Sequence, residues 1–333
     1  MINTLKGLDI LRGDQLSVEQ VELICDTAAR LELIMRDGGR LSVLKDRVLA
    51  TLFYEPSTRT RLSFETAMLH LGGHVISVAD AKTSSSAAKG ESLWDTGKMV
   101  EAYADVVVIR HPVVGSAQEL AAGCGVPVIN GGDGSGQHPT QALLDAYTIR
   151  KEKGRFEGLT AGMVGDLKNG RTVHSLSALL TTLGVRLFYF VAPPELPMPP
   201  DLTASLRARG ATIIETPDLA EAAAHCDVLY MTRVQRERFT DPAEYERVRH
   251  AYVLTLPIVE SGKPGMMVMH PLPRVDEIAT EVDACPGAAY FRQAANGVPV
   301  RMALIALVTG AELQFPEVSE AEWATLRPQA SCV

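Results

Sequence analysis

A run of hydroxyl and guanidinium side chains, Glu55-Pro56-Ser57-Thr58-Arg59-Thr60-Arg61, is the segment best suited to chemistry. It lies between the apolar run 48–54 and an amphipathic helix pattern, so we expect a strand to turn into a helix there. A helix N-terminus exposes unpaired backbone N–H groups and carries partial positive charge. Together with the Ser, Thr and Arg side chains, this end would suit a dianionic phosphate.

Ordinary capping is the simpler interpretation of the same segment. Ser57 or Thr58 would cap the helix, and Arg59 and Arg61 would be solvated. Negative charge is favoured in a first helical turn, so Arg59 opposes the helix dipole unless an anion lies beside it. That local conflict favours an anion-binding function.

Two further arginines follow predicted strands. Arg171 comes after the strand and loop 163–170, and Arg233 after the run 228–231. Ligands bind at the carboxyl ends of strands in open α/β sheets, and two separated arginines suit an acid with two carboxylates. Each alone would equally fit a surface arginine.

His138 lies at the start of a predicted helix. Taken by itself, it would be a histidine whose hydrogen bonds are made within the protein, and Lys89 would be a solvated surface charge.

Short apolar runs alternating with helical patterns predict βαβ units around parallel sheets. Phe64, Ala67, Met68 and Leu71 form one helical face, which Gly72 and Gly73 end. The expected strands are 48–54, 74–78, 105–109, 126–129, 161–165, 185–191, 211–214, 228–231 and 266–269. The expected helices are 139–150, those after Arg171, Asp218 and Pro242, and 300–308, which should pack back on the first domain.

With 333 residues and 46% hydrophobic content, the chain exceeds one ordinary core. We expect two doubly wound parallel-sheet α/β domains, 1–147 completed by a C-terminal helix within 297–333, and 148–296. The small polar stretch 82–90 predicts a mobile surface loop, and the prolines of 193–200 an exposed connection.

Composition limits the classes of partner and compartment. A formal net charge of -8 argues against a nucleic-acid surface. The five cysteines are scattered singly, which fits a reducing cytoplasm, and no stretch has the roughly 20 apolar residues of a membrane helix. We therefore expect a soluble, cytoplasmic protein without a targeting segment.

The sequence resembles the aspartate/ornithine carbamoyltransferase family, whose carbamoyl-phosphate motif is Ser-Thr-Arg-Thr-Arg at such a turn. The resemblance extends nearly end to end. The matching segments are Ser57–Arg61, Lys89–Ser92, Arg110–Pro112, His138–Asp145, Arg171–Ser175, Arg233–Gln235 and His270–Arg274. It implies transfer of a carbamoyl group from carbamoyl phosphate to an amino acid, with the active site between the two domains.

The resemblance also implies which residues bind carbamoyl phosphate: Ser57, Thr58, Arg59, Thr60, Ser85, Lys89, Arg110, His138, Gln141, Leu272 and Pro273. Catalytic roles are implied for Arg59, Thr60, Lys89, Arg110 and His138. In the family pattern, His138 bonds the carbonyl oxygen and Gln141 lies near the carbamoyl nitrogen. Ser85 and Lys89 would enter from a neighbouring subunit, which implies a homotrimer with shared sites.

Family membership alone does not choose between aspartate and ornithine. Ornithine enzymes typically have Lys in place of Glu55 and His-Cys-Leu-Pro in place of His270–Pro273, and a cationic substrate would be repelled by Arg233. We therefore expect L-aspartate as acceptor and the committed step of de novo pyrimidine biosynthesis. The implied aspartate-binding residues are Lys89, Arg171, Arg233, Gln235 and Leu272, with Pro273 fixing the direction of the Leu272 carbonyl.

The expected mechanism needs no metal or organic cofactor. Carbamoyl phosphate binds first, the domains close as aspartate enters, and the neutral amine attacks the carbonyl carbon. A regulatory or dihydroorotase-like partner chain is compatible with the family. Two other classes are kept as alternatives. The sequence argues against a nicotinamide dehydrogenase, because no Gly-x-Gly-x-x-Gly follows a predicted strand and the glycine-rich stretch 131–136 leads directly into the His138 motif. A non-catalytic relative of the same fold is disfavoured because all the matched site residues are present.

Overall fold

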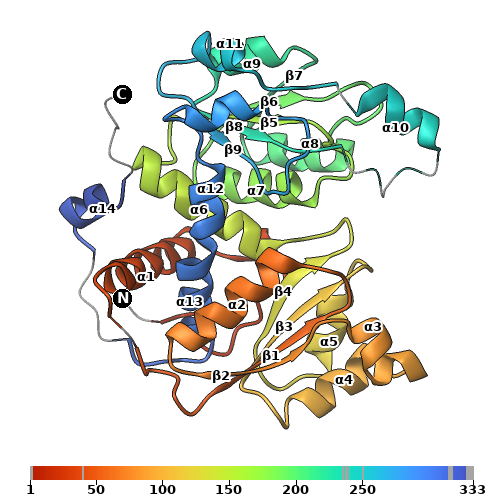
Figure 1. Ribbon diagram of the computed structural model, residues 1–333, viewed down its shortest axis with the longest axis vertical. Helices are drawn as coiled ribbons and strands as arrows, with labels where there is room; N and C mark the ends of the chain where they lie inside the picture. Colours follow the sequence, from red (N-terminus) through yellow and green to blue (C-terminus); the bar gives the residue numbers. More distant parts are fainter. Residues whose placement is uncertain are drawn as a thin grey trace. The chain divides into compact units, whose positions relative to one another are not determined.

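The apolar runs pair into two parallel sheets, one in each of two units of the chain (Figure 1). The computed structural model describes residues 3–39, 41–234, 236, 239, 241–249, 251–313 and 318–327. The first unit contains the described residues up to Tyr147 together with Asn296–Arg327, and the second contains Thr148–Ala295. The predicted fold class, two parallel-sheet α/β domains, is confirmed.

The sheet of the first unit has the strand order β2-β1-β3-β4, with all pairs parallel. Central β1 and β3 are almost wholly buried, as expected for parallel strands covered on both faces. The edge strand β2 is largely exposed. The strand bounds are β1 Val48–Phe53, β2 His74–Val78, β3 Val106–His111 and β4 Val128–Asp133.

Helix α13 (Gly297–Val308) returns to the first unit and packs on α1 (Val18–Arg36) and α2 (Thr58–His70), as predicted. It is buried along nearly its whole length. The three helices lie side by side in Figure 1. The remaining helical elements of this unit are η1 Gly13–Gln15, α3 Ala81–Ser84, η2 Ser86–Lys89, α4 Leu93–Val100, α5 Ser116–Ala122 and α14 Glu320–Leu326, while α6 Pro139–Lys153 runs from the first unit into the second.

The predicted apolar face of α2 is confirmed, since Phe64, Ala67, Met68 and Leu71 are buried. At the end of the helix Gly72 adopts a φ of 81°, a left-handed conformation that lets the next N–H, that of Gly73, reach the Met68 carbonyl oxygen at 3.0 Å. A β-carbon at Gly72 would lie 2.8 Å from the Leu41 carbonyl oxygen, so the tight exit requires glycine.

The second unit has the strand order β7-β6-β5-β8-β9, again all parallel. Alternate residues of each strand enter two separate apolar clusters, such as Met163 in one and Val164 in the other. Both faces of the sheet are therefore covered. The strands are β5 Thr160–Val164, β6 Leu187–Val191, β7 Thr212–Thr216, β8 Val228–Met231 and β9 Met267–Met269; the helical elements are α7 Arg171–Thr182, α8 Pro200–Ala208, α9 Leu219–His225, α10 Pro242–Val248, α11 Leu256–Glu260, η4 Thr280–Ala284 and α12 Tyr290–Ala295.

Several predictions about elements were incomplete or wrong, and helices α4, α5, α8, α11 and α12 were not among the predicted elements. The stretch 82–90 is not a plain loop, because it contains the end of α3 and the short helix η2. The connection 193–200 is not wholly exposed: Leu196 and Met198 are 2% and 4% exposed, and Pro200 begins α8. Helix α1 is absent from the predicted elements. Strands β3 and β4 run on past their predicted ends because polar and glycine residues continue the backbone pairing.

Among the described residues, no helix is long and apolar enough to cross a membrane. None of the described cysteines, Cys25, Cys124, Cys226 and Cys285, forms a disulfide bond.

Candidate active site

The hydroxyl and guanidinium segment follows β1 and begins α2, as predicted. Ser57 is the N-cap residue, but its side chain makes no capping hydrogen bond, and the first turn of α2 contains no acidic residue. Ordinary capping by Ser57 is therefore not what the structure shows. The first-turn N–H groups and the Ser57 hydroxyl together form a donor-rich, electropositive end.

Arg59 lies in this first turn, where no described residue provides a counter-ion. Within the described part of the chain, its side chain forms no hydrogen bond or ion pair, and partial burial lowers the pKa of its guanidinium. Arg61, by contrast, lies 3.9 Å from Glu65 one turn later. Of the two arginines, Arg59 is the one whose charge is left for an external anion.

Arg110 lies beside this segment because of strand register. Residue Phe53 at the end of β1 pairs with Arg110 in β3, and the Tyr54 N–H donates to the Arg110 carbonyl oxygen at 2.8 Å. The Arg110 guanidinium is 3.4 Å from a carboxylate oxygen of Glu55 and donates to the Gly131 carbonyl oxygen at 3.3 Å. These contacts hold a partly buried cation at the carboxyl edge of the sheet.

The loop between β4 and α6 is folded around the buried carboxylate of Asp133. The two oxygens of this carboxylate accept hydrogen bonds from the Gln137 N–H at 2.6 Å and from the Gly115 N–H at 2.8 Å. This loop delivers His138, 4% exposed, to the start of α6. Gly131 and Gly132 belong to β4 itself, so the glycine-rich stretch is not a dinucleotide-binding turn before a helix.

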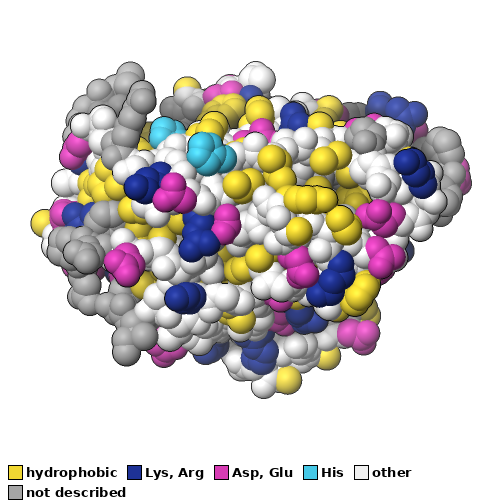
Figure 2. Space-filling view, turned by 90° about the horizontal axis from the view of Figure 1, so that it is seen from below, with side chains coloured by type: hydrophobic (Ala, Val, Ile, Leu, Met, Phe, Trp, Pro, Cys, Tyr) yellow, Lys and Arg dark blue, Asp and Glu magenta, His cyan; other side chains and the backbone are white. Residues whose placement is uncertain are grey.

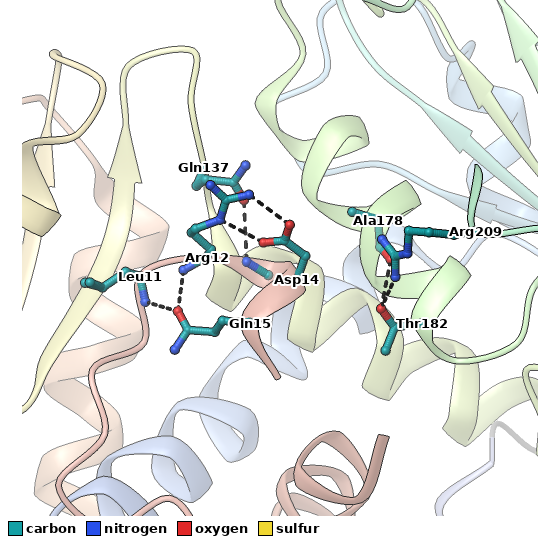
Figure 3. A network of polar contacts seen from close by, with 9 residues as sticks. Leu11, Arg12, Asp14, Gln15, Gln137, Ala178, Thr182 and Arg209 are labelled. Carbon is teal, nitrogen blue, oxygen red and sulfur yellow. Dashed lines mark hydrogen bonds and ion pairs between the residues drawn. The ribbon is translucent and has the colours of Figure 1, made fainter. Parts of the chain in front are cut away.

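The residue before His138 is held by the segment around η1 (Figure 3). The Gln137 side-chain oxygen accepts from the Gly13 N–H at 3.4 Å, while Arg12 forms a two-bond fork with Asp14 at 2.9 and 2.8 Å. Gln15 accepts from the backbone N–H groups of Leu11 and Arg12. Within the second unit, Figure 3 shows a separate contact, in which Arg209 donates to the Thr182 hydroxyl.

The other predicted donor-site residues differ in how much the structure says of them. Thr60 is buried at 7% exposure, and the amide nitrogen of Gln141 donates to Asp145 at 2.9 Å. The Ser85 hydroxyl is used locally, because it accepts from the Ala87 N–H at 3.2 Å and caps η2. Lys89 is exposed at the end of η2, and within the described residues no hydrogen bond or ion pair joins it to another predicted residue.

In the second unit, Arg171 and Arg233 follow neighbouring strands. Strands β5 and β8 pair with Val164 opposite Met231, and the Thr232 N–H donates to the Val164 carbonyl oxygen at 2.8 Å. Arg171 begins α7 after a loop in which Asp166 accepts from the Asn169 N–H at 2.9 Å. Both arginines are partly buried at one edge of the sheet. Gln235, predicted to act with them, lies outside the described residues.

The next strand at that edge, β9, leads into a turn with a cis Leu272–Pro273 peptide and a φ of 53° at Leu272. A buried network holds this turn. His270 Nδ1 accepts from the Leu272 N–H at 2.8 Å, and His270 Nε2 lies 2.7 Å from Glu277. The Gln293 side-chain oxygen accepts from the His270 N–H at 2.9 Å.

These bonds determine the protonation of the pair. Because Nδ1 accepts a bond, the proton of neutral His270 lies on Nε2 and is donated to Glu277. Burial lowers the pKa of His270. Burial opposes ionisation of Glu277, but bonds from His270 and nearby backbone N–H groups outweigh it and lower its pKa. His270, Glu277 and Gln293 were not predicted as individual site residues, since their contacts arise only on folding.

Each unit thus places cationic or polar groups at or just after the carboxyl ends of three neighbouring parallel strands, β1, β3 and β4 in the first and β5, β8 and β9 in the second. Carboxyl edges of this kind bind ligands in α/β folds. The first edge combines a helix N-terminus with Arg59 and Arg110, which suits a phosphate. The second combines Arg171, Arg233 and a fixed backbone turn, which suits an acid with a hydrogen-bonding group.

Two family descriptions match the chain. "Aspartate/ornithine carbamoyltransferase, carbamoyl-P binding domain" matches residues 8–151, and "Aspartate/ornithine carbamoyltransferase, Asp/Orn binding domain" matches residues 157–308. The aspartate carbamoyltransferase catalytic subunit of Thermococcus kodakarensis is 52% identical over 92% of this chain and 98% of its own length. That of Chromobacterium violaceum is 51% identical over 88% of this chain and 94% of its own length.

Solved structures agree with these matches. The aspartate transcarbamoylase of Trypanosoma cruzi, crystallised with carbamoyl phosphate and aspartate, superposes with a TM-score of 0.87 at 40% identity, covering 92% of this chain and 98% of that one. The catalytic subunit of the M. jannaschii enzyme gives a TM-score of 0.82 at 48% identity, covering 89% and 96%. The chain therefore belongs to the aspartate/ornithine carbamoyltransferase family.

Proposed function

We propose that this chain transfers the carbamoyl group of carbamoyl phosphate to the amine of L-aspartate, forming N-carbamoyl-L-aspartate and phosphate. The observation that carries the proposal is the donor-rich turn after β1, where the Ser57 side chain makes no capping hydrogen bond, Arg59 lies in the first turn of α2, and Arg110 lies at the end of the neighbouring strand β3. Relatives about 50% identical along nearly the whole chain are named for this activity, which supports the same choice.

The donor phosphate would be bound by Ser57, Thr58, Arg59 and Thr60 at the start of α2. Arg110 would bridge phosphate and carbonyl oxygen, because a planar guanidinium can give two charge-assisted bonds. His138 would donate to the carbonyl oxygen and Gln141 would face the carbamoyl nitrogen. Ser85 and Lys89 would come from a neighbouring copy, consistent with the exposure of Lys89.

The acceptor would be held by its two carboxylates, the α-carboxylate on Arg171 and the β-carboxylate on Arg233 and Gln235. The Leu272 carbonyl, directed by Pro273, would accept from the attacking amine and the carbamoyl nitrogen. Aspartate is favoured over ornithine because a cationic side chain beside Arg233 would be repelled. We assign carbamoyl phosphate to the domain 1–147 with 297–333 and aspartate to the domain 148–296.

In the proposed reaction, the neutral amine of aspartate attacks the carbonyl carbon and a C–N bond forms. Charge grows on the carbonyl oxygen, where Thr60, Arg110 and His138 would stabilise it. The carbon–oxygen bond to phosphate then breaks, and the departing phosphate takes the amine proton. The chain's contribution is positioning and electrostatic stabilisation rather than a covalent intermediate.

A homotrimer with shared sites follows from the proposed role of Lys89. Large apolar side chains reach the surface in patches (Figure 2). Most of the described ones belong to the first unit: Val18, Leu62, Leu69, Ile76, Trp94, Met99, Tyr103, Val113 and Val114. Such an apolar surface supports contacts between subunits through that unit.

The proposal also includes a cytoplasmic location, a step in pyrimidine biosynthesis and association with a regulatory or dihydroorotase-like chain.

The decisive test is an assay of the purified chain with carbamoyl phosphate and either L-aspartate or L-ornithine. Product from aspartate alone is expected, and product from ornithine alone would overturn the acceptor assignment. Titration with an analogue carrying a phosphonate and two carboxylates, with molecular mass measured alongside, tests the site and the trimer together. Failure of that analogue to bind would remove the assignment of the arginines.

A further inference from the structure

The orientation of the Gln141 amide is fixed by a carboxylate. Its Nε2 atom lies 2.9 Å from Oδ1 of Asp145, one turn later on α6. An ionised carboxylate accepts hydrogen bonds and donates none, so the nitrogen end of the amide faces Asp145. The opposite, carbonyl end of Gln141 is therefore directed away from Asp145 as an acceptor.

Asp145 is fully buried, and a buried cation on another helix supports its charge. Arg301 of α13 is 3% exposed, and this burial lowers the pKa of its guanidinium to about 10. The negative charge of Asp145 acts in the opposite direction and raises that pKa. The guanidinium donates to the Thr140 hydroxyl at 3.3 Å and lies 5.0 Å from the centre of the Phe64 ring. Three helices thus hold the cation beside the start of α6.

Packing alone does not explain this cation. The rest of α13 is an apolar, buried helix, and the buried Nε atom of Arg301 has no hydrogen-bond partner in the described part of the chain. A β-carbon at Gly297 would lie 2.3 Å from a guanidinium nitrogen of Arg301. The absence of a side chain at Gly297 therefore leaves room for this guanidinium. Apolar residues often replace a buried charged pair without loss of stability, which points to a role other than packing.

We propose that Asp145, supported by Arg301, positions Gln141 so that its carbonyl oxygen accepts from the N–H bonds of the carbamoyl group. The pair would thereby select carbamoyl phosphate over acetyl phosphate, in which a methyl group replaces the amino group at nearly the same size and charge. This inference rests on the proposed function, which places Gln141 at the carbamoyl nitrogen. Asp145 and Arg301 are positioning residues and touch no substrate.

The measurement is the ratio of kcat/KM for carbamoyl phosphate to kcat/KM for acetyl phosphate, with L-aspartate as acceptor. Both constants come from one preparation, so the ratio does not depend on the fraction of protein that is folded. Gln141→Met removes the acceptor and keeps the length of the side chain. We expect this variant to lower the ratio by roughly 10- to 100-fold, because an N–H group of the bound carbamoyl phosphate then has no hydrogen-bond acceptor.

Asp145→Asn can accept from or donate to Gln141, so the amide is no longer held in one orientation. The expected fall in the ratio is about 10-fold, and Arg301→Met should produce a smaller fall in the same direction. Arg301→Met also serves if Asp145→Asn yields no folded protein. Glu152→Gln is the matched control, because it removes a carboxylate paired with Arg292 at 2.8 Å on the same helix. Its ratio should equal that of the wild type.

The inference is wrong if Asp145→Asn and Arg301→Met both keep the wild-type ratio, or if Gln141→Met keeps it. A wild-type chain that transfers neither acyl group to aspartate would instead refute the proposed function. The two failures are distinguished by the wild-type assay alone.

Discussion

The two carboxyl edges use different means to present polar groups. In the first unit, side chains carry the polarity: Arg59 on α2, Arg110 within β3 and His138 at the start of α6. In the second, a backbone turn at Leu272 shares the edge with two arginines, and buried His270 and Glu277 hold that turn. Side-chain sites are visible in a sequence, whereas a site made of backbone is visible only through the residues that shape it.

The largest expected effect is at the first edge, where Arg59→Ala removes a cation that has no partner among the residues the structure describes. Because charge grows on the leaving phosphate, we expect kcat/KM to fall about 1000-fold. Arg61→Ala is the matched control, since Arg61 already lies 3.9 Å from Glu65 one turn along the same helix and such i,i+4 pairs contribute little. Steady-state kinetics of both variants test this prediction. Equal losses of kcat/KM would mean that the overall positive charge of the turn matters, rather than a direct contact of Arg59 with the phosphate.

At the second edge, Arg233→Leu should raise KM for aspartate about 100-fold, because a carboxylate loses its charge-assisted bonds. The dissociation constant of carbamoyl phosphate, measured by calorimetry without aspartate, should stay within a few fold. Arg207→Leu is the control, since it removes only an exposed pair with Glu215. Weakened binding of carbamoyl phosphate by Arg233→Leu would break the division of ligands between the two edges.

The backbone turn is tested by Glu277→Gln. The amide must place an NH2 group against either the Nε2–H of His270 or the N–H groups of Val275 and Asp276, so one buried contact is lost. We expect about a 10-fold rise in KM for aspartate and a lower Tm. Glu281→Gln on η4 is the exposed control. A lower Tm with unchanged KM would make the network purely structural.

The smallest effect concerns acid stability of the second unit. Burial lowers the pKa values of His270 and His174. As the pH drops below about 6.5, these histidines become protonated in the unfolded chain but stay neutral in the folded one. The free energy of unfolding therefore decreases as the pH is lowered, until the pKa of the folded histidines is reached. Each can contribute up to about 1.4 kcal/mol per pH unit. Urea unfolding at pH 7.5 and 5.5 checks this, and equal free energies would contradict it.

Strongly patterned elements were predictable from the sequence. Strands β2 and β8 have the predicted bounds, and the apolar face of α2 is buried as expected. Helix α1 was absent from the predicted elements although Ser17 and Gln20 form a capping box that its sequence shows. The ends of β3 and β4 could not be predicted, because Arg110, His111 and Gly131 break the apolar pattern while the backbone keeps its pairing.

The candidate site divides in the same way. The arginines were predictable because charge at a strand end is a local signal, whereas their supports were not. Arg301 meets Thr140 across 161 positions of sequence, and Gln293 meets His270 across 23. Contacts of that separation depend on topology, which no local pattern of residues encodes.

The return of α13 to the first unit has a consequence for synthesis. The first unit is interrupted by 148–295, and the helix that covers α1 and α2 leaves the ribosome only after this whole insertion. The second unit is continuous and can assemble as it emerges, while the first must keep the apolar sides of α1 and α2 uncovered until α13 arrives. During that interval, the earlier-made half of the protein is the one exposed to aggregation and in need of chaperones.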